Sequence, residues 1–519
     1  MVTEERRTEG QDYDPGWDGV WTSQARITGA GWTATIGIPF TTLNFTRSQD
    51  VVWGLNFKRF SRRKNEEDLW SGYRRVFGFT KVSEAGELHG ITDIGSGRLF
   101  IVKPYGLLGL NRLSTSRGTD FLHTGGVDIK YGLRSSLVAN LTGNTDFADA
   151  DVDQQQFNLT PFRLFFPEKR QFFLENAGVF DFSTAFQGSV LDRYNRTGGL
   201  DTRLVFFKNL IVHGYGAMTD SPGVSGGNSD VGGDVSYQNN WLEFVARRNK
   251  IGPNFNPQVG FVDRTDVNQS ETDINFKPRP KIHGVRELNF ESFIYHAPDT
   301  RGVLQTQEWQ TTFRANFNNG AYTDDDIVDV FTQRLTQPFN IYKNVNIPPG
   351  LYHFTRHQLT YGSGQDRRLT FNLFERFGTY YDGHLNELQV RTNYRPASRF
   401  SLATTATWNR FNLREGKFSV VLAGLQANYS FSRFLTTSTL VQLDTANTQA
   451  LSTNIRLRYN YRPDSDLYVI YNVGTRFASL AVTNPRQLRE QRFEVKFTYS
   501  FTPSLERARK AEQAQTDVP

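Results

Sequence analysis

The segment Arg492-Phe493-Glu494-Val495-Lys496-Phe497-Thr498-Tyr499-Ser500-Phe501 alternates without a break between two kinds of residue. Odd positions hold aromatic or β-branched side chains, and even positions hold charged or hydroxyl side chains. Because successive side chains of a β-strand point to opposite faces, this segment predicts a strand with one apolar and one polar face. We expect lipid or interfacial contact at Phe493, Val495, Phe497, Tyr499 and Phe501, and a lumen-facing position for Glu494, Lys496, Thr498 and Ser500.

A final amphipathic strand that ends in Phe is typical of bacterial outer-membrane barrels, and the composition favours strands as the membrane-crossing elements. Of the 519 residues, 38% are hydrophobic and 14% aromatic, and no run approaches the roughly 20 apolar residues of a spanning helix. Cysteine is absent from the sequence, which excludes disulfides and thiolate metal sites. The net charge of +6 comes from basic residues interspersed with acidic ones, so we expect no nucleic-acid partner.

Amphipathic strands dominate from Phe100 onward. Arg456 and Arg458 alternate with apolar residues in the segment 455–461, and Arg391 lies in a similar alternation over 388–394. Arginine is costly on a lipid face, so all three are expected to face a lumen. At about 20 residues per strand and turn, residues 98–501 predict an all-β, transmembrane antiparallel barrel of on the order of 16 to 20 strands.

Turn positions give the two rims of this barrel. Tight turns at 394–400, 429–434 and 461–467 are expected at the periplasmic rim, while 444–449 and 484–489 are expected at the opposite rim. Residues 220–230 and 336–350 are predicted to be loops. A large soluble propeller or sandwich would also alternate, but the outward faces are too consistently aromatic for contact with water.

Residues 1–97 have a different character. Short β runs at 17–21, 31–40 and 51–60 are separated by turn residues and predict a partial N-terminal β-sandwich. No signal peptide is visible in the first residues, so we expect the numbering to start from a processed or trimmed form or from a late start codon. Residues 502–519 form a polar tail.

The segment 146–182 interrupts the alternation. It mixes aromatic and charged residues that cannot all face lipid together. We expect the segment to fold into the lumen, where its charged side chains can pair with groups of the barrel wall. The residues expected in this plug are Phe162, Phe165, Phe166, Glu168, Lys169, Arg170, Phe172, Phe173 and Glu175.

The run 165–175 has the sequence FFPEKRQFFLE, which is specific enough to compare with a known family. Together with Asp151-Val152-Asp153 before it, this run resembles the signature of an uncharacterised family of bacterial outer-membrane β-barrels that follow a domain similar to carbohydrate-binding module family 9. The runs at 17–21, 31–40 and 53–60 look like the closing strands of such a module, and 256–262 also looks like a family element. About half of the expected module is absent upstream of Met1, so sugar binding is not assigned to named residues.

Metal and catalytic motifs are weak in this sequence. Asp149, Asp151 and Asp153 have the spacing of the first calcium ligands of a loop, but no Gly follows at the sixth position and Thr160 replaces the bidentate Glu. A solvated or arginine-paired acidic strand end is therefore favoured over calcium, and no cofactor is expected. The acids at 324–326 and 329 are interpreted as a lumen or loop cluster, and His353 and His357 would share one strand face without a third ligand. No catalytic residue is assigned, although carboxylate pairs for glycoside hydrolysis cannot be seen in a sequence.

These features predict a Gram-negative outer-membrane barrel whose partners are the lipid bilayer, saccharides and other envelope proteins. The favoured function is a porin-like, plugged or gated pore that transports small polar solutes or saccharides. The alternatives are a structural or docking barrel of a larger envelope complex, and a carbohydrate-binding or glycoside-active protein. The N-terminal domain and the tail are expected in the periplasm, and a lumen lined by Arg391, Arg456, Arg458 and Lys496 predicts mild anion selectivity.

Overall fold

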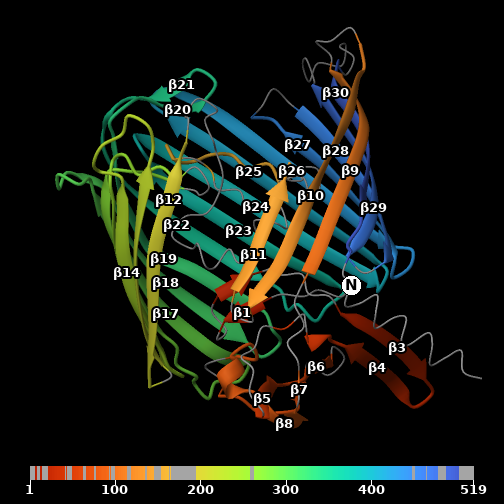
Figure 1. Cartoon of the computed structure of the whole chain (residues 1–519). Helices are drawn as coiled ribbons and strands as arrows, with labels where there is room; N and C mark the ends of the chain where they lie inside the picture. The colour runs from red at the N-terminus through yellow and green to blue at the C-terminus, as the bar shows by residue number, and fades with distance from the viewer. Residues whose placement is uncertain are drawn as a thin grey trace, which may run out of the picture.

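The structure of the chain is a computed structural model that describes residues 6–8, 12–14, 21–40, 43, 50–61, 66–74, 78–92, 94, 100–113, 118–134, 137–144, 154–162, 164, 194–207, 209–257, 262–446, 450–462, 464–476 and 487–501. Strands make up most of this described part (Figure 1). One short 3-10 helix, η2 (Val82–Glu84), is the exception. No helix in the described ranges has the length and apolarity needed to cross a membrane.

Twenty antiparallel strands form a closed barrel in the order β9 to β19 and then β22 to β30. This number lies within the predicted range of strands. The barrel strands are β9 (Phe100–Leu113), β10 (Asp120–Arg134), β11 (Leu137–Gly143), β12 (Arg196–Phe206), β13 (Leu210–Asp220), β14 (Ser229–Gln238), β15 (Leu242–Ile251), β16 (Val267–Phe276), β17 (Val285–Pro298), β18 (Leu304–Phe317), β19 (Tyr322–Leu335), β22 (Gly350–Gly362), β23 (Leu369–Tyr380), β24 (Gly383–Ala397), β25 (Phe400–Leu413), β26 (Gly416–Ser430), β27 (Leu435–Asp444), β28 (Ala450–Arg462), β29 (Ser465–Arg476) and β30 (Gln487–Thr498).

The amphipathic segment at the C-terminal end forms β30, which closes the barrel. β30 pairs with β29 on one side and with β9 on the other, and Phe501 makes a further bridge to Val102. Closure gives the backbone N–H and C=O groups of the first and last strands a partner, which a hydrocarbon environment requires.

The two ends of the barrel differ. Short turns join β24 to β25, β26 to β27 and β28 to β29 at one end, as the turn residues predicted. The opposite end also has two-residue turns, between β23 and β24 and between β25 and β26, and it carries the hairpin of β20 (Phe339–Tyr342) with β21 (Val345–Ile347). This hairpin lies within 336–350, which the sequence analysis took for a loop. Its strands exist because Ile341 and Ile347 are buried in a cluster at this rim.

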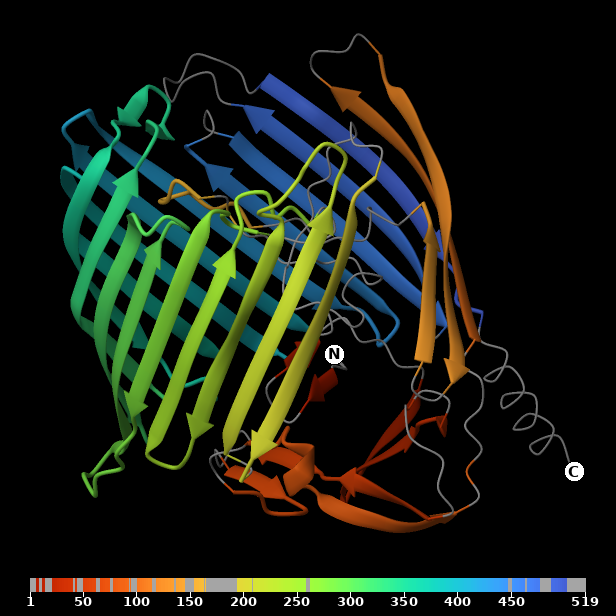
Figure 2. The same cartoon turned by 60° about the vertical axis from the view of Figure 1, so that its left-hand side comes forward.

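The N-terminal strands lie at the end of the barrel opposite β20 and β21, where β24 turns into β25 and β26 into β27 (Figures 1 and 2). They pair two by two, as β1 (Arg6–Thr8) with β2 (Asp12–Asp14), β3 (Thr22–Thr28) with β4 (Gly31–Gly37), β5 (Asp50–Leu55) with β8 (Gly86–Thr92), and β6 (Lys58–Ser61) with β7 (Glu66–Leu69). Strands were predicted at 31–40 and 51–60 and are present. The described residues form four small sheets here, and Trp32 and Ile36 stay exposed, so a β-sandwich remains a prediction.

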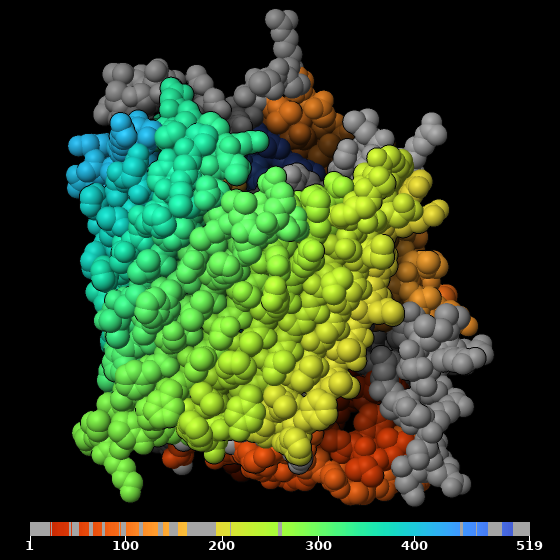
Figure 3. Space-filling view, turned by 90° about the vertical axis from the view of Figure 1, so that its left-hand side faces the viewer, coloured from red at the N-terminus to blue at the C-terminus, as the bar shows by residue number. Residues whose placement is uncertain are grey.

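The outer wall of the barrel is apolar, and its inner wall is polar. Along β30, Phe493 and Phe497 are 42% and 48% exposed, whereas Glu494 and Lys496 are 4% and 0% exposed. The same alternation runs through the other strands, and Figure 3 shows the outer side chains of β12 to β19 as a continuous surface between the rims. A closed antiparallel barrel with these two faces belongs to the class of transmembrane β-barrels.

Candidate functional site: the barrel lumen

The pairing register places the predicted lumen residues on one face. Arg456 pairs with Ser438 and Ile470, and Ile470 pairs with Glu494, so these side chains share a side of the sheet. Arg458 lies one rung further on that face and forms two hydrogen bonds with Asp466, at 2.8 and 2.9 Å. Successive pairings from Arg391 across β25, β26 and β27 reach Gln442 on the same inner face.

Paired charges cross the inner wall between strands. The guanidinium of Arg356 on β22 contacts Asp329 at 2.9 and 3.2 Å and Glu308 at 3.3 Å, thereby joining three strands. Arg376 on β23 donates to Glu387 at 3.2 Å and to Gln358 at 3.0 Å. These pairs are largely shielded from solvent, so each charge depends on its partner.

Half of the lumen is acidic, and of its carboxylates the sequence analysis considered only those at 324–329, as a lumen or loop cluster. The register places a series of carboxylates on the inner face of β14 to β19: Asp230, Asp234, Glu243, Glu271, Asp273, Glu291, Glu308, Asp324, Asp326 and Asp329. These strands stand opposite β28 to β30, where Arg456, Arg458 and Lys496 lie. The first wall is therefore predominantly acidic, although Arg247, Arg314 and Arg356 pair with some of its carboxylates. The facing wall mixes its bases with Asp466 and Glu494, so a uniformly positive lining is not what the structure shows.

Part of this acidic row depends on irregular pairing. Asp326 and Asp329 are an odd number of residues apart and would face opposite sides of a regular strand. A register shift between them returns both to the inner face. Asp326 accepts hydrogen bonds from Gln310 at 2.6 Å and Thr312 at 2.8 Å, so the acid cluster at 324–329 lies in the lumen, except for outward-facing Asp325.

A described piece of the predicted inward segment contacts this inner wall. The backbone N–H of Gln155 donates to Gln442 Oε1 at 2.9 Å, and the Tyr380 hydroxyl donates to the carbonyl oxygen of Leu159. Phe162, the first predicted plug residue, lies 4.5 Å from the guanidinium of Arg264. The other predicted plug residues (Phe165, Phe166, Glu168, Lys169, Arg170, Phe172, Phe173 and Glu175) lie outside the described residues.

A polar hollow of about 340 Å³ lies between residues 154–159 and the inner face of β24 to β27. Nine of its nineteen lining residues carry an amide or a hydroxyl, and one acid, one base, one aromatic ring and seven aliphatic or small residues complete the lining. The polar lining residues are Gln154, Gln155, Gln156, Glu387, Gln389, Arg391, Thr405, Thr407, Asn409, Gln426 and Gln442, with Phe157 at one side. Such a lining offers both donors and acceptors at many angles.

An aromatic cluster lies inside the barrel near the rim that carries β20 and β21. Phe157 packs 5.8 Å from Phe411 and 6.4 Å from both Tyr342 and Phe418, measured between ring centroids. Tyr342 comes from the hairpin and stacks on Phe418 at 4.5 Å. The hairpin and the inward segment thus share one apolar core inside the barrel.

The metal candidates gain no support. Asp149, Asp151 and Asp153 fall outside the described residues. Within the described ranges, no cluster of three or more potential ligands is suited to a metal ion. His353 and His357 share the outer face of β22, as their spacing predicted, where His353 contacts Thr332 and His357 stacks on Phe377.

Comparison with known proteins adds a family match. Residues 97–187 match the family described as "Domain of unknown function (DUF5916)". The match includes the run 165–175, but it begins after the N-terminal strands and so leaves their resemblance to a carbohydrate-binding module untested. No curated protein matches the sequence.

The chain also has a likeness to solved bacterial proteins. OccAB4 of Acinetobacter baumannii is 8% identical to this chain, with a TM-score of 0.28, and the match covers 78% of this chain and 98% of OccAB4. OpdO of Pseudomonas aeruginosa is 9% identical with a TM-score of 0.29, covering 79% and 99%. An anion-selective porin from Comamonas acidovorans is 10% identical with a TM-score of 0.30, covering 59% and 100%. The fold assignment rests on the strand pairing of this chain itself.

Proposed function

We propose that the protein is an outer-membrane pore for small polar, uncharged solutes, with saccharides as the principal class. The observation that carries this proposal is the hollow of about 340 Å³ between residues 154–159 and the inner wall. Amide and hydroxyl groups match the density of hydroxyls on a sugar, and the Phe157 ring offers an apolar surface for the C–H groups of a sugar ring.

The charge pattern supports uncharged or dipolar cargo. Carboxylates line β14 to β19, and Arg456, Arg458 and Lys496 stand across the lumen. A field across the lumen orients a dipole without adding a net attraction for one sign of ion. The basic residues alone predicted mild anion selectivity. With the carboxylates included, we expect the pore to discriminate only weakly between anions and cations.

We propose that the inward segment narrows the pore. Residues 154–159 already contact the inner wall, and the chain that follows carries Glu168, Lys169, Arg170 and Glu175. We place these charges, with Phe165, Phe166, Phe172 and Phe173, in the lumen, because unpaired burial elsewhere would cost several kcal/mol per charge. The segment then acts as a plug or gate.

Orientation follows from the rims. The N-terminal strands and Phe501 lie at the end opposite the rim that carries the long connection with β20 and β21. In bacterial barrels the end without long connections is the periplasmic one. We therefore place residues 1–97 and the tail 502–519 in the periplasm of a Gram-negative cell. The N-terminal part is a candidate for saccharide contact through its module-like strands.

Liposome swelling and planar-bilayer recordings test the pore. The intact protein should give small currents and slow swelling in pentoses, with little swelling in trisaccharides. Replacing residues 154–159 by a Gly-Ser repeat should increase both currents and swelling, whereas replacing Lys343 and Asn344 at the hairpin tip by Gly-Ser should change neither. Absence of sugar-dependent swelling in both the intact and the 154–159 variant would contradict the proposal.

A docking barrel is the second candidate, and the exposed apolar hairpin β3–β4 favours it. Ile27 is 89% exposed, Trp32 62% and Ile36 57%. Such a patch is unusual without a partner surface. Replacing Trp32 and Ile36 by Ser should release the barrel from a larger assembly on native gels of solubilised envelopes, while unchanged migration would count against docking.

A further inference from the structure

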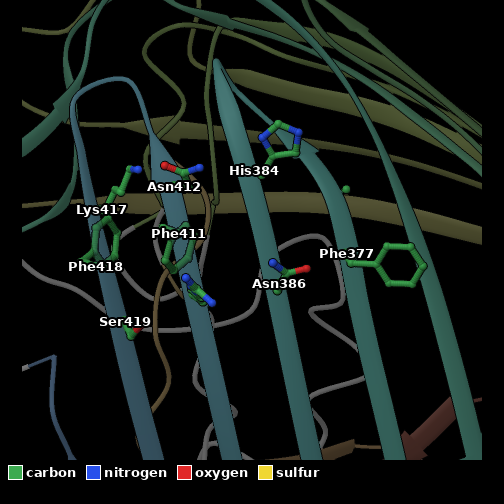
Figure 4. A pocket seen from close by; sticks show the side chains of 10 residues that line it. Phe377, His384, Asn386, Phe411, Asn412, Lys417, Phe418 and Ser419 are labelled. Carbon is green, nitrogen blue, oxygen red and sulfur yellow. The ribbon is translucent and has the colours of Figure 1, made fainter.

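A second polar hollow lies on the outer wall, away from the lumen. Its volume is about 630 Å³, and its lining includes His384 and Asn386 of β24, Arg410 and Asn412 of β25, and Lys417 and Ser419 of β26. Figure 4 shows side chains of these three neighbouring strands side by side at the hollow. The six polar residues are exposed, whereas Leu385, Asn409 and Phe411 between them are at most 2% exposed and face inward. Phe411 and Phe418 nevertheless also line the hollow.

The register arranges these six residues as a grid. One rung holds His384, Asn412 and Lys417, and the next holds Asn386, Arg410 and Ser419. Adjacent strands are about 4.8 Å apart, so three strands span roughly 10 Å, which suits a phosphate with its substituents. Every residue of the grid can donate a hydrogen bond, and Arg410 and Lys417 are cationic.

The grid sits at the edge of the apolar belt. The rung directly below it, toward the β24–β25 turn, is Leu388, Trp408 and Val421, and the exposed Glu375 of β23 pairs with Leu388 on the same rung. A transmembrane strand takes about 9 to 11 residues to cross the hydrocarbon. Counted from the exposed Tyr394 on β24, that length ends near His384, and counted from the exposed Tyr429 on β26 it ends near Ser419. The hollow therefore lies at headgroup height.

Among the described residues, no acid is paired with the cations of the grid. Within the described ranges, none of the ion pairs involves Arg410 or Lys417. The nearest acids in the adjoining turns, Asp382 and Glu415, contact each other, and burial followed by this contact raises the pKa of Glu415. Glu375, on the outer face of β23, lies one rung below Phe377.

We propose that this hollow is a binding site for the anionic phosphate headgroup of a membrane lipid. The lipid phosphate would contact Arg410 and Lys417, the amides and the hydroxyl would bind its ester and polar oxygens, and the acyl chains would extend over Leu388, Trp408 and Val421. The six polar residues of the site lie on the opposite face of the barrel wall from the lumen, whereas Phe411 and Phe418, which also line the hollow, pack on Phe157 inside the barrel.

Native mass spectrometry of the detergent-solubilised full chain tests the site, with phosphatidylglycerol, phosphatidylcholine and inorganic phosphate as probes. The double variant Arg410→Gln/Lys417→Gln should bind phosphatidylglycerol about 10- to 30-fold more weakly, as expected for the loss of two basic residues at a membrane surface. The matched control Arg414→Gln/Lys343→Gln removes the same charge from the same rim outside the hollow, and should bind as the native protein does. Heat-modifiable migration on gels verifies that each variant is folded.

Three outcomes decide the matter. Loss of phosphatidylglycerol in the first variant alone, with weak phosphatidylcholine binding throughout, supports the site. Equal retention in both variants overturns it. Displacement of phosphatidylglycerol by millimolar inorganic phosphate would show a site for free phosphate and overturn the assignment to a lipid headgroup.

Discussion

Replacing Arg356 by Met should destabilise the barrel strongly, because this guanidinium neutralises two carboxylates inside the wall. It contacts Asp329 at 2.9 Å through Nε and Glu308 at 3.3 Å through Nη2, and lies 5.0 Å from the Phe331 ring. The side chains of Arg356, Asp329 and Glu308 are 15%, 5% and 21% exposed. Met keeps most of the aliphatic stem and removes the charge.

The magnitude follows from the partners that remain. Removing one member of a buried pair costs about 3 to 5 kcal/mol, because an uncompensated charge stays behind. Here two carboxylates are left on neighbouring strands, while the partial exposure of Glu308 allows some hydration. We therefore expect about 3 to 4 kcal/mol, within the range for buried pairs. Adding Asp329→Asn should recover more than half of this loss.

Equilibrium unfolding in urea, followed by tryptophan fluorescence in lipid vesicles, measures the effect. Arg247→Met is the matched control, because Arg247 pairs with Glu271 at 3.2 Å but the two side chains are 52% and 31% exposed. That change should cost at most about 1 kcal/mol. Equal costs for Arg356→Met and Arg247→Met would refute the argument from burial.

Three further predictions concern other parts of the chain. Val495→Arg should cost about 2 to 4 kcal/mol if the outward face of β30 meets the bilayer midplane, and Gln307→Arg near the rim of β18 at most about 1 kcal/mol, both measured by refolding into vesicles. Phe157→Ala should destabilise the barrel by about 2 to 3 kcal/mol, which is below the usual cost for an enclosed Phe because this ring is half-buried. The same change should raise the single-channel conductance, and an unchanged conductance would show that Phe157 does not restrict the pore. The backbone N–H of Val303 and the Arg301 side chain bind the Asp299 carboxylate and hold its pKa below its ordinary value. The ionised Asp299 therefore stabilises the fold fully at pH values above the unfolded pKa of about 3.9, and this stabilisation is lost as the pH falls through the folded pKa. Asp299→Asn should therefore be less stable than the native protein in urea at pH 7 and equal to it in strong acid, and a difference that persists in acid would contradict this.

The inward segment shows how far sequence reasoning reached in the candidate site. The mixture of aromatic and charged residues in 146–182 predicted an inward fold, and residues 154–159 do contact the inner wall. Nothing in the sequence indicated that Phe157 would meet Tyr342 of a hairpin far along the chain. The sequence analysis weighed the basic lumen residues and the acids at 324–329 but missed the carboxylates of β14 to β18, because those strands alternate less regularly.

The sequence by itself determined which side chains of each strand share a face, since a period of two is a local property of the extended chain. That was sufficient for the amphipathic strands, for their apolar and polar faces and for a barrel rather than helices. Tertiary structure alone decided the strand number, the register and the closure of β30 on β9, because each depends on which backbone groups remain unpaired elsewhere. The shift between Asp326 and Asp329 and the contacts of Arg356 with two other strands follow from that register. They could not be derived from alternation, because pairing partners are fixed only when the whole ring of strands closes.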